Sequence, residues 1–117
     1  MAYNRQPISY FTSGKVTDQI AEEYGSYLEL LDRDDLVRIT AICALYRVYR
    51  ETSGDSHENV FYDAVDTTSY YDSINLLEAQ PRFADLLSEF LENQHDSSVN
   101  NFIEAIQNLI SYYPEAV

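Results

Sequence analysis

The chain has 117 residues, of which 45% are hydrophobic and 23% charged, and this length and apolar content fit one domain with a single core. Twenty acidic residues against seven basic ones give a net charge of −13, which disfavours direct binding to nucleic acid or to an anionic membrane surface. The longest uncharged apolar stretch covers only residues 39–46, so no membrane-spanning helix is predicted, since such a helix needs about 20 residues.

Residues 1–16 are predicted to form an ordered arm that packs on a helical domain of residues 17–117. The arm shows no helical period, yet Ile8 and Phe11 make it too apolar for a free tail. From Thr17, a residue type common at helix N-caps, apolar residues recur at spacings of three and four. This spacing predicts a first helix with one apolar face, formed by Ile20, Tyr24, Tyr27, Leu28 and Leu31.

A second helix, of about residues 35–51, is predicted to lie at the centre of the fold. Asp32 or Asp34 can cap its start, and Gly54 follows its end. Its apolar residues cover almost every face, which is typical of a helix surrounded by others. They include Cys43, the single cysteine of the chain, which we expect to be a buried and unreactive thiol.

The rest of the chain predicts further helices. A short one, of about residues 57–66, is followed by Thr67, Thr68 and Ser69, and it stays open whether the segment up to residue 80 is a second helix or a bent continuation. Residues 83–91 and 99–113 have regular apolar faces and are separated by a polar loop at 93–98. Because no convincing strand pattern occurs, the sequence predicts an all-α fold: a compact single-domain bundle of five or six helices around the central apolar helix.

Catalytic and metal-binding motifs are missing from the sequence. His57 and Glu58 match the first two positions of the H-E-x-x-H zinc motif, but its second histidine is replaced by Phe61. No cysteine pair is present, and the three glycines form no phosphate-binding loop. We therefore expect no metal, no cofactor and no catalytic activity. The alternative is an enzyme that assembles His57, Asp63, a tyrosine or Cys43 in a cleft.

The negative charge is concentrated in the second half of the chain. Six basic and seven acidic residues in 1–50 leave a charge of −1, whereas one basic and thirteen acidic residues in 51–117 leave −12. Four carboxylates at spacings of four, three and four residues are predicted to line one helix face: Asp85, Glu89, Glu92 and Asp96. This face is a candidate protein-interaction surface, and a merely solubilising surface is the alternative. Asp18, Glu22 and Glu29 form a similar row on the first helix.

The arginines of the central helix form a second candidate. Arg47 and Arg50 lie in its last turns, where cations complement the helix dipole. Helical spacing predicts the local ion pairs Asp34–Arg38 and Arg47–Glu51. Alternatively, Arg47 and Arg50 contact a carboxylate-rich partner or fold back on the acidic half of the chain.

Adjacent tyrosines form a third candidate. Tyr70 and Tyr71 precede Asp72, and Tyr112 precedes Tyr113. Neighbouring positions on a helix point about 100° apart, so at most one tyrosine of each pair is expected to be fully buried. Exposed tyrosine beside carboxylates is typical of protein-binding patches, although half-buried tyrosines are also common elsewhere.

These patterns favour a small, non-catalytic adaptor or regulatory protein that engages a basic surface of a partner protein. A nucleic-acid mimic that inhibits a DNA- or RNA-binding protein is one alternative, because carboxylates four residues apart on a helix repeat about every 6 Å, as phosphates do along a strand. A small enzyme and a homo-oligomeric structural subunit are the others. The lone cysteine and the absence of a secretory signal at the start of the sequence favour a cytoplasmic location.

Overall fold

The computed structural model of the protein describes residues 6–93 and 96–112, except for the side chains of Asp72 and Asp96. All regular structure in these residues is helical, which confirms the predicted all-α fold. The described part of the chain contains seven helices rather than five or six: α1 (Ile8–Phe11), α2 (Lys15–Tyr24), α3 (Arg33–Ser53), α4 (His57–Asp72), α5 (Leu76–Ala79), α6 (Pro81–Asn93) and α7 (Asp96–Ile110).

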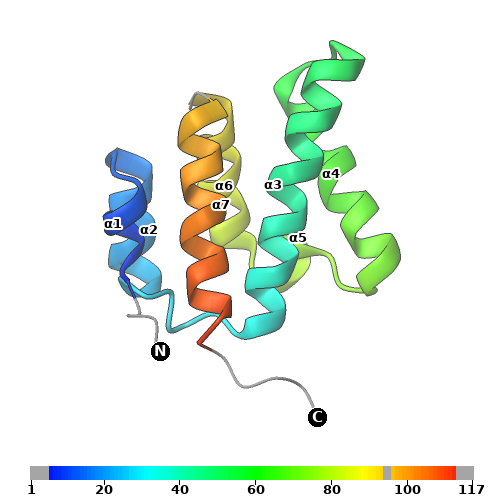
Figure 1. The fold of residues 1–117 in the computed structure, drawn as a ribbon. Coiled ribbons are helices and arrows are strands. Elements are labelled where there is room, and N and C mark those ends of the chain that lie inside the picture. Colours follow the sequence, from blue (N-terminus) through cyan, green and yellow to red (C-terminus); the bar gives the residue numbers. More distant parts are fainter. Residues whose placement is uncertain (1–5, 94–95, 113–117) are drawn as a thin grey trace.

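Six of the helices form two rows of three (Figure 1). Helices α1, α7 and α3 make one row, and α2, α6 and α4 make the row behind it. Contacts between α1 and α2 and between α3 and α4 close the two ends, while the short α5 connects α4 to α6. Phe90 of α6 and Phe102 of α7 join the rows in the middle, with ring centroids 4.8 Å apart. The apolar faces of both rows therefore enclose a single core.

The sequence signals at the ends of α3 act as predicted. Asp32 caps the helix, since its Oδ1 accepts a hydrogen bond from the Asp35 backbone N–H at 2.8 Å, and Asp35 Oδ2 accepts one from the Asp32 N–H at 3.2 Å. This reciprocal pair is a capping box. Gly54 ends the helix in the left-handed conformation, with φ of 69°, which a glycine adopts without steric cost.

The first predicted helix is shorter than its apolar spacing indicated. α2 begins at Lys15 and ends at Tyr24, because the chain turns at Gly25, where φ is 95°. Leu28, with φ of 51°, and Leu31 are buried from the following loop instead of from a helix. The spacing correctly identified these two leucines as buried, but it wrongly placed them in a helix.

The N-terminal arm also differs from the prediction in its conformation. It contains the helical turn α1, which packs against α7 and α2. Ile8 is fully buried, whereas Tyr10 remains 68% exposed. In the described part of the arm, the contacts of α1 therefore lie with α7 and α2.

Residues 57–72 form one continuous helix, which settles the first part of the segment that the sequence left open. The hydroxyl groups at its middle do not interrupt it: Thr68 Oγ1 donates to the Ala64 carbonyl at 2.9 Å, and Thr67 Oγ1 lies 2.9 Å from the Tyr49 hydroxyl. The helix ends where Ser73 adopts a positive φ of 66°. α5 then forms a separate turn before Pro81.

α3 is covered on two sides and open on the third, which corrects the prediction of a helix surrounded by others. It packs against α4 and α7, and its third side faces solvent, so Val37 and Val48 are 43% and 53% exposed. Arg38, in contrast, is buried. It pairs with Asp35 at 2.8 Å, whereas the spacing pointed to Asp34. Because apolar residues lie on most sides of α3, its sequence does not show which side packs in the core and which side lies at the surface.

No helix in residues 6–93 and 96–112 combines the length and the hydropathy needed to cross a lipid bilayer.

Candidate functional site

The acidic face of α6 is present, but it is shorter than predicted. Asp85, Glu89 and Glu92 are exposed on the side of α6 opposite its buried phenylalanines and leucines. α6 ends at Asn93, and Asp96 begins α7, so Asp96 does not continue this row. Of the polar loop predicted at 93–98, residue 93 belongs to α6 and residues 96–98 belong to α7, which begins earlier than its apolar period indicated, while residues 94 and 95 lie outside the described residues.

These three carboxylates border a groove between α6 and the first turns of α4, here called the acidic groove. It has a volume of about 520 Å³ and a fourth carboxylate, Glu58, on the side of α4. Of the described residues that line it, none is lysine or arginine. Four apolar or aromatic residues also line it, namely Phe61, Tyr62, Leu77 and Ala84, together with the polar Ser56, His57 and Ser88. The groove therefore combines negative charge with apolar surface.

His57 is the polar centre of this groove. Its Nδ1 lies 2.6 Å from the Tyr46 hydroxyl, and its Nε2 lies 3.0 Å from Ser88 Oγ. In the neutral imidazole that carries its proton on Nε2, Tyr46 donates to Nδ1 and Nε2–H donates to Ser88. The histidine thereby ties α3, α4 and α6 together.

Burial is the main influence on this histidine. Desolvation holds the pKa of His57 below its ordinary value of 6.5, and Arg50 acts in the same direction. Glu92 and Glu58 oppose them, because nearby negative charge favours the imidazolium ion. Burial likewise raises the pKa of the Tyr46 hydroxyl, which keeps it protonated as a donor to His57.

The lowered pKa of His57 predicts a loss of stability in mild acid. As the pH falls below 6.5, the unfolded chain takes up a proton at this histidine before the folded chain does, so the free energy of unfolding decreases until the folded pKa is passed. The measurement is urea denaturation of the wild type and of His57→Gln between about pH 5 and 8. The difference between the two curves should fall towards acid. A difference that is constant across this range would contradict the assignment.

A serine hydrogen-bonded to a histidine also occurs in hydrolase active sites, but the surroundings of Ser88 differ from those of a hydrolase nucleophile. Ser88 is in the middle of α6, where backbone N–H groups are engaged in the helix, and its neighbours in the groove are carboxylates. Both features disfavour an oxyanion, which needs unengaged donors close to the nucleophile. Of the residues of the enzyme alternative, His57 lies beside the Tyr46 hydroxyl, but Cys43 and Asp63 do not join them. Cys43 is buried in the core with its pKa raised to about 12, and Asp63 does not line the groove.

The tyrosine candidates lie elsewhere. Tyr70 and Tyr71 are each 82% exposed in the last turn of α4, with their rings edge to face and centroids 5.2 Å apart. Neither lines the acidic groove. The side chain of Asp72 and all of Tyr113 lie outside the described residues, while Tyr112 is 38% exposed.

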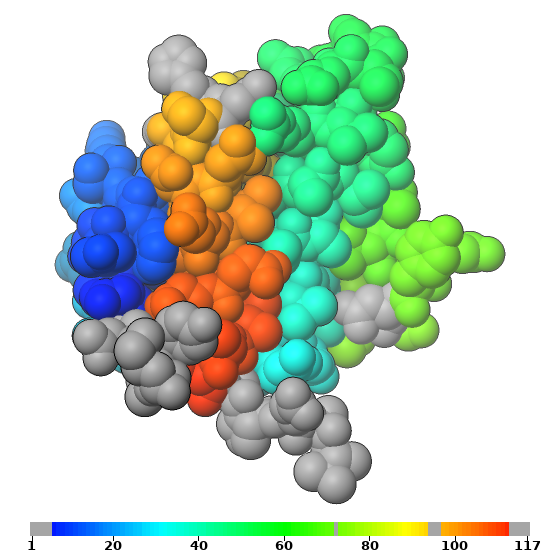
Figure 2. All heavy atoms as spheres, in the orientation of Figure 1, coloured from blue at the N-terminus to red at the C-terminus, as the bar shows by residue number. Residues whose placement is uncertain are grey.

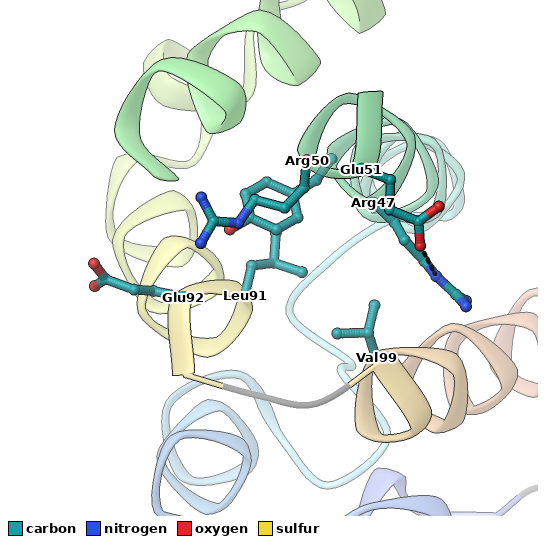
Figure 3. A pocket seen from close by; sticks show the side chains of 7 residues that line it. Arg47, Arg50, Glu51, Leu91, Glu92 and Val99 are labelled. Carbon is teal, nitrogen blue, oxygen red and sulfur yellow. Dashed lines mark ion pairs between the residues drawn. The ribbon is translucent and has the colours of Figure 1, made fainter. Parts of the chain in front are cut away.

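Arg47 and Arg50 border a smaller pocket of about 140 Å³ between α3, α6 and the start of α7 (Figure 3). Arg47 forms the predicted ion pair with Glu51, with Nε and Oε1 3.8 Å apart, and also donates to the Asn100 side chain. Arg50 donates to the Asp55 carbonyl at 3.1 Å and, in Figure 3, extends to the same side as Glu92 of α6. The structure thus directs Arg50 towards the acidic half of the chain.

Sequence reasoning missed Ser88 and Tyr46 as members of the site. Ser88 was recoverable, because it shares a helix face with Asp85, Glu89 and Glu92. Tyr46 gave no such signal, since its position in an apolar helix indicated only a core residue. It is in fact buried with its hydroxyl aimed at His57.

Within residues 6–93 and 96–112, no group of three or more histidine, cysteine, aspartate or glutamate side chains is arranged to hold a metal ion. Comparison with known proteins gives no match: no family model fits the sequence, and no curated protein or solved structure is detectably similar to it.

Proposed function

We propose that this protein is a non-catalytic adaptor or regulatory protein that binds a basic segment of a partner protein in the acidic groove. The observation that carries the proposal is the lining of the groove, with four carboxylates, apolar side chains and no lysine or arginine among its described residues. A chain segment with cations and one or two apolar side chains complements both properties.

The geometry suits an extended or helical segment better than a small molecule. The groove is open, and its carboxylates come from two helices, Glu58 from α4 and the others from α6. Cations on the partner would meet these carboxylates along the rim, while an apolar side chain would rest on Phe61 and Leu77. The charged rim chiefly accelerates association, and the apolar contacts chiefly slow dissociation.

Binding of a short, fluorescently labelled arginine- and leucine-rich peptide tests this proposal by anisotropy. The double variant Glu89→Lys/Glu92→Lys is expected to weaken binding by about tenfold or more, because it reverses two charges at the rim of the groove. Raising NaCl from about 50 to 300 mM is expected to weaken wild-type binding as well, because the charges are exposed and screened.

The matched control is Asp18→Lys/Glu22→Lys on α2, which changes the net charge by the same amount on exposed residues outside the groove. We expect it to change the affinity by less than about threefold, because distant charges are screened at physiological salt. Equal losses in both double variants would show that only net charge matters and would reject the groove as the binding site.

A nucleic-acid mimic is the second candidate. It is favoured by the spacing of Asp85 and Glu89, four residues apart on one helix, which is about 6 Å of rise and similar to the phosphate repeat. Competition separates the two functions, because a mimic displaces nucleic acid from its target, whereas an adaptor binds its partner without doing so. We further propose a cytoplasmic location, consistent with the buried free thiol of Cys43.

A further inference from the structure

The outer face of α3 is an apolar strip along a helix that is otherwise packed into the bundle. Val37, Ala41, Ala44 and Val48 recur at spacings of four, three and four, which places them on one line of the helix. Val37, Ala44 and Val48 are exposed, and Ala41 is half-buried. Figure 2 shows that α3 reaches the surface between the orange α7 and the yellow-green α4. We call these four residues the α3 strip.

A groove runs beside the α3 strip on the side of α4. It has a volume of about 500 Å³ and a mainly apolar lining, to which the α3 strip contributes Val37 and Ala41. Leu45 and the exposed Tyr71 also line it. Strip and groove together form an apolar helix face with small residues at its centre, which allows close approach of a second helix.

We infer that the α3 strip is the contact of a homodimer, in which α3 packs antiparallel against α3 of a second copy. The strip is self-complementary about a two-fold axis between residues 42 and 43. In that register Val37 lies opposite Val48 of the second copy, and Ala41 lies opposite Ala44 of the second copy. A two-fold interface of this kind uses the same patch on both chains.

The charges at the two ends of α3 favour the antiparallel over the parallel arrangement. Arg33 at the start and Glu51 at the end share the side of the strip that faces α7, by their positions on the helical wheel. The antiparallel register places Arg33 of each copy beside Glu51 of the other, whose side chain is 63% exposed. In a parallel pair the two-fold axis runs along the helices, so the flank that carries Arg33 and Glu51 would lie on opposite sides of the contact in the two copies, and this attraction would be missing.

The charges of α3 beside this face are balanced, which limits the repulsion that a second copy meets. The protein carries a net charge of −13, and exposed carboxylates dominate α2 and α6. Around the α3 strip, Arg33 and Arg47 balance Asp34 and Glu51. Two strongly acidic chains can therefore approach each other here without stacking like charges.

Sedimentation velocity at increasing protein concentration tests the dimer. We expect a monomer–dimer equilibrium in the range of roughly 10–100 μM, as fits a contact limited to one helix pair. Val48→Asp is expected to raise the dissociation constant by at least about tenfold, since it places a charge opposite an apolar side chain. Leu30→Asp is the matched control, because Leu30 is 71% exposed outside the strip and its loss should leave the dimer unchanged.

A charge exchange tests the register. Arg33→Glu and Glu51→Arg should each weaken the dimer by about tenfold, and the double variant should return it to within threefold of the wild type. Glu89→Lys/Glu92→Lys, in the acidic groove, should leave the dimer intact, so this inference and the proposed function can fail separately. A chain that stays monomeric at millimolar concentration overturns the inference, and a double variant as weak as the single ones overturns the register.

Discussion

Replacing Phe90 by alanine is expected to lower the free energy of unfolding by about 4 kcal/mol, which is a large share of the 5–15 kcal/mol typical of a domain of this size. Phe90 is 1% exposed on α6, and its ring lies 4.8 Å from that of Phe102 on α7. The substitution removes apolar burial and leaves a cavity between the two rows of helices. Because the rows meet here, little can collapse to fill it.

Urea denaturation followed by circular dichroism measures this effect, with Glu89→Ala as the control. Glu89 is the preceding residue on the same helix and is exposed, so its loss should change the free energy of unfolding by less than about 0.5 kcal/mol. A cost for Phe90→Ala below about 1.5 kcal/mol would mean that the rows do not meet at this position as described.

Replacing Asp35 by alanine is the second substitution with a large expected effect, a loss of about 3 kcal/mol. Asp35 Oδ1 accepts from the buried Arg38 guanidinium at 2.8 Å, and its Oδ2 accepts from the Asp32 N–H at 3.2 Å. The variant therefore removes a carboxylate from beside a buried cation and half of the capping box. The cost arises chiefly because the buried Arg38 loses its ion pair with this carboxylate.

Asp34→Ala is the matched control for this substitution. Asp34 lies in the same first turn of α3 but is exposed, so only a favourable interaction with the helix dipole is lost, about 0.5 kcal/mol. The double variant Asp35→Leu/Arg38→Met should recover at least half of the loss, since a buried ion pair can be replaced by apolar side chains at little cost. No recovery would show that the capping box, and not the ion pair, carries the effect.

The helices themselves were largely predictable, because apolar spacing reports which side chains of a segment share a face. The segments at 83–91 and 99–113 matched α6 and most of α7 for this reason, and Asp32 and Gly54 marked the ends of α3. The errors fell at turns. Leu28 continues the helical spacing of the first helix, but the backbone had already turned at Gly25, and tertiary packing buried the leucine from a loop.

The candidate site was predictable only on the side of α6. Asp85, Glu89 and Glu92 follow from local spacing, which fixes their common face whatever the fold. That Glu58 lies across a groove from them depends on how α4 packs against α6. The same packing brings Tyr46, His57 and Ser88 into hydrogen-bonding distance, although they are far apart in the chain.

The sequence by itself determined that this protein is an all-α domain with most of its negative charge in its second half, because composition and helical periodicity are local properties. Only the tertiary structure decided which apolar face is covered. The residues of α3 are apolar on nearly all sides, yet α4 and α7 cover two of them and leave Val37, Ala44 and Val48 at the surface. The burial of a residue depends on which other helices pack against its own helix. The apolar spacing within one helix does not specify those neighbours.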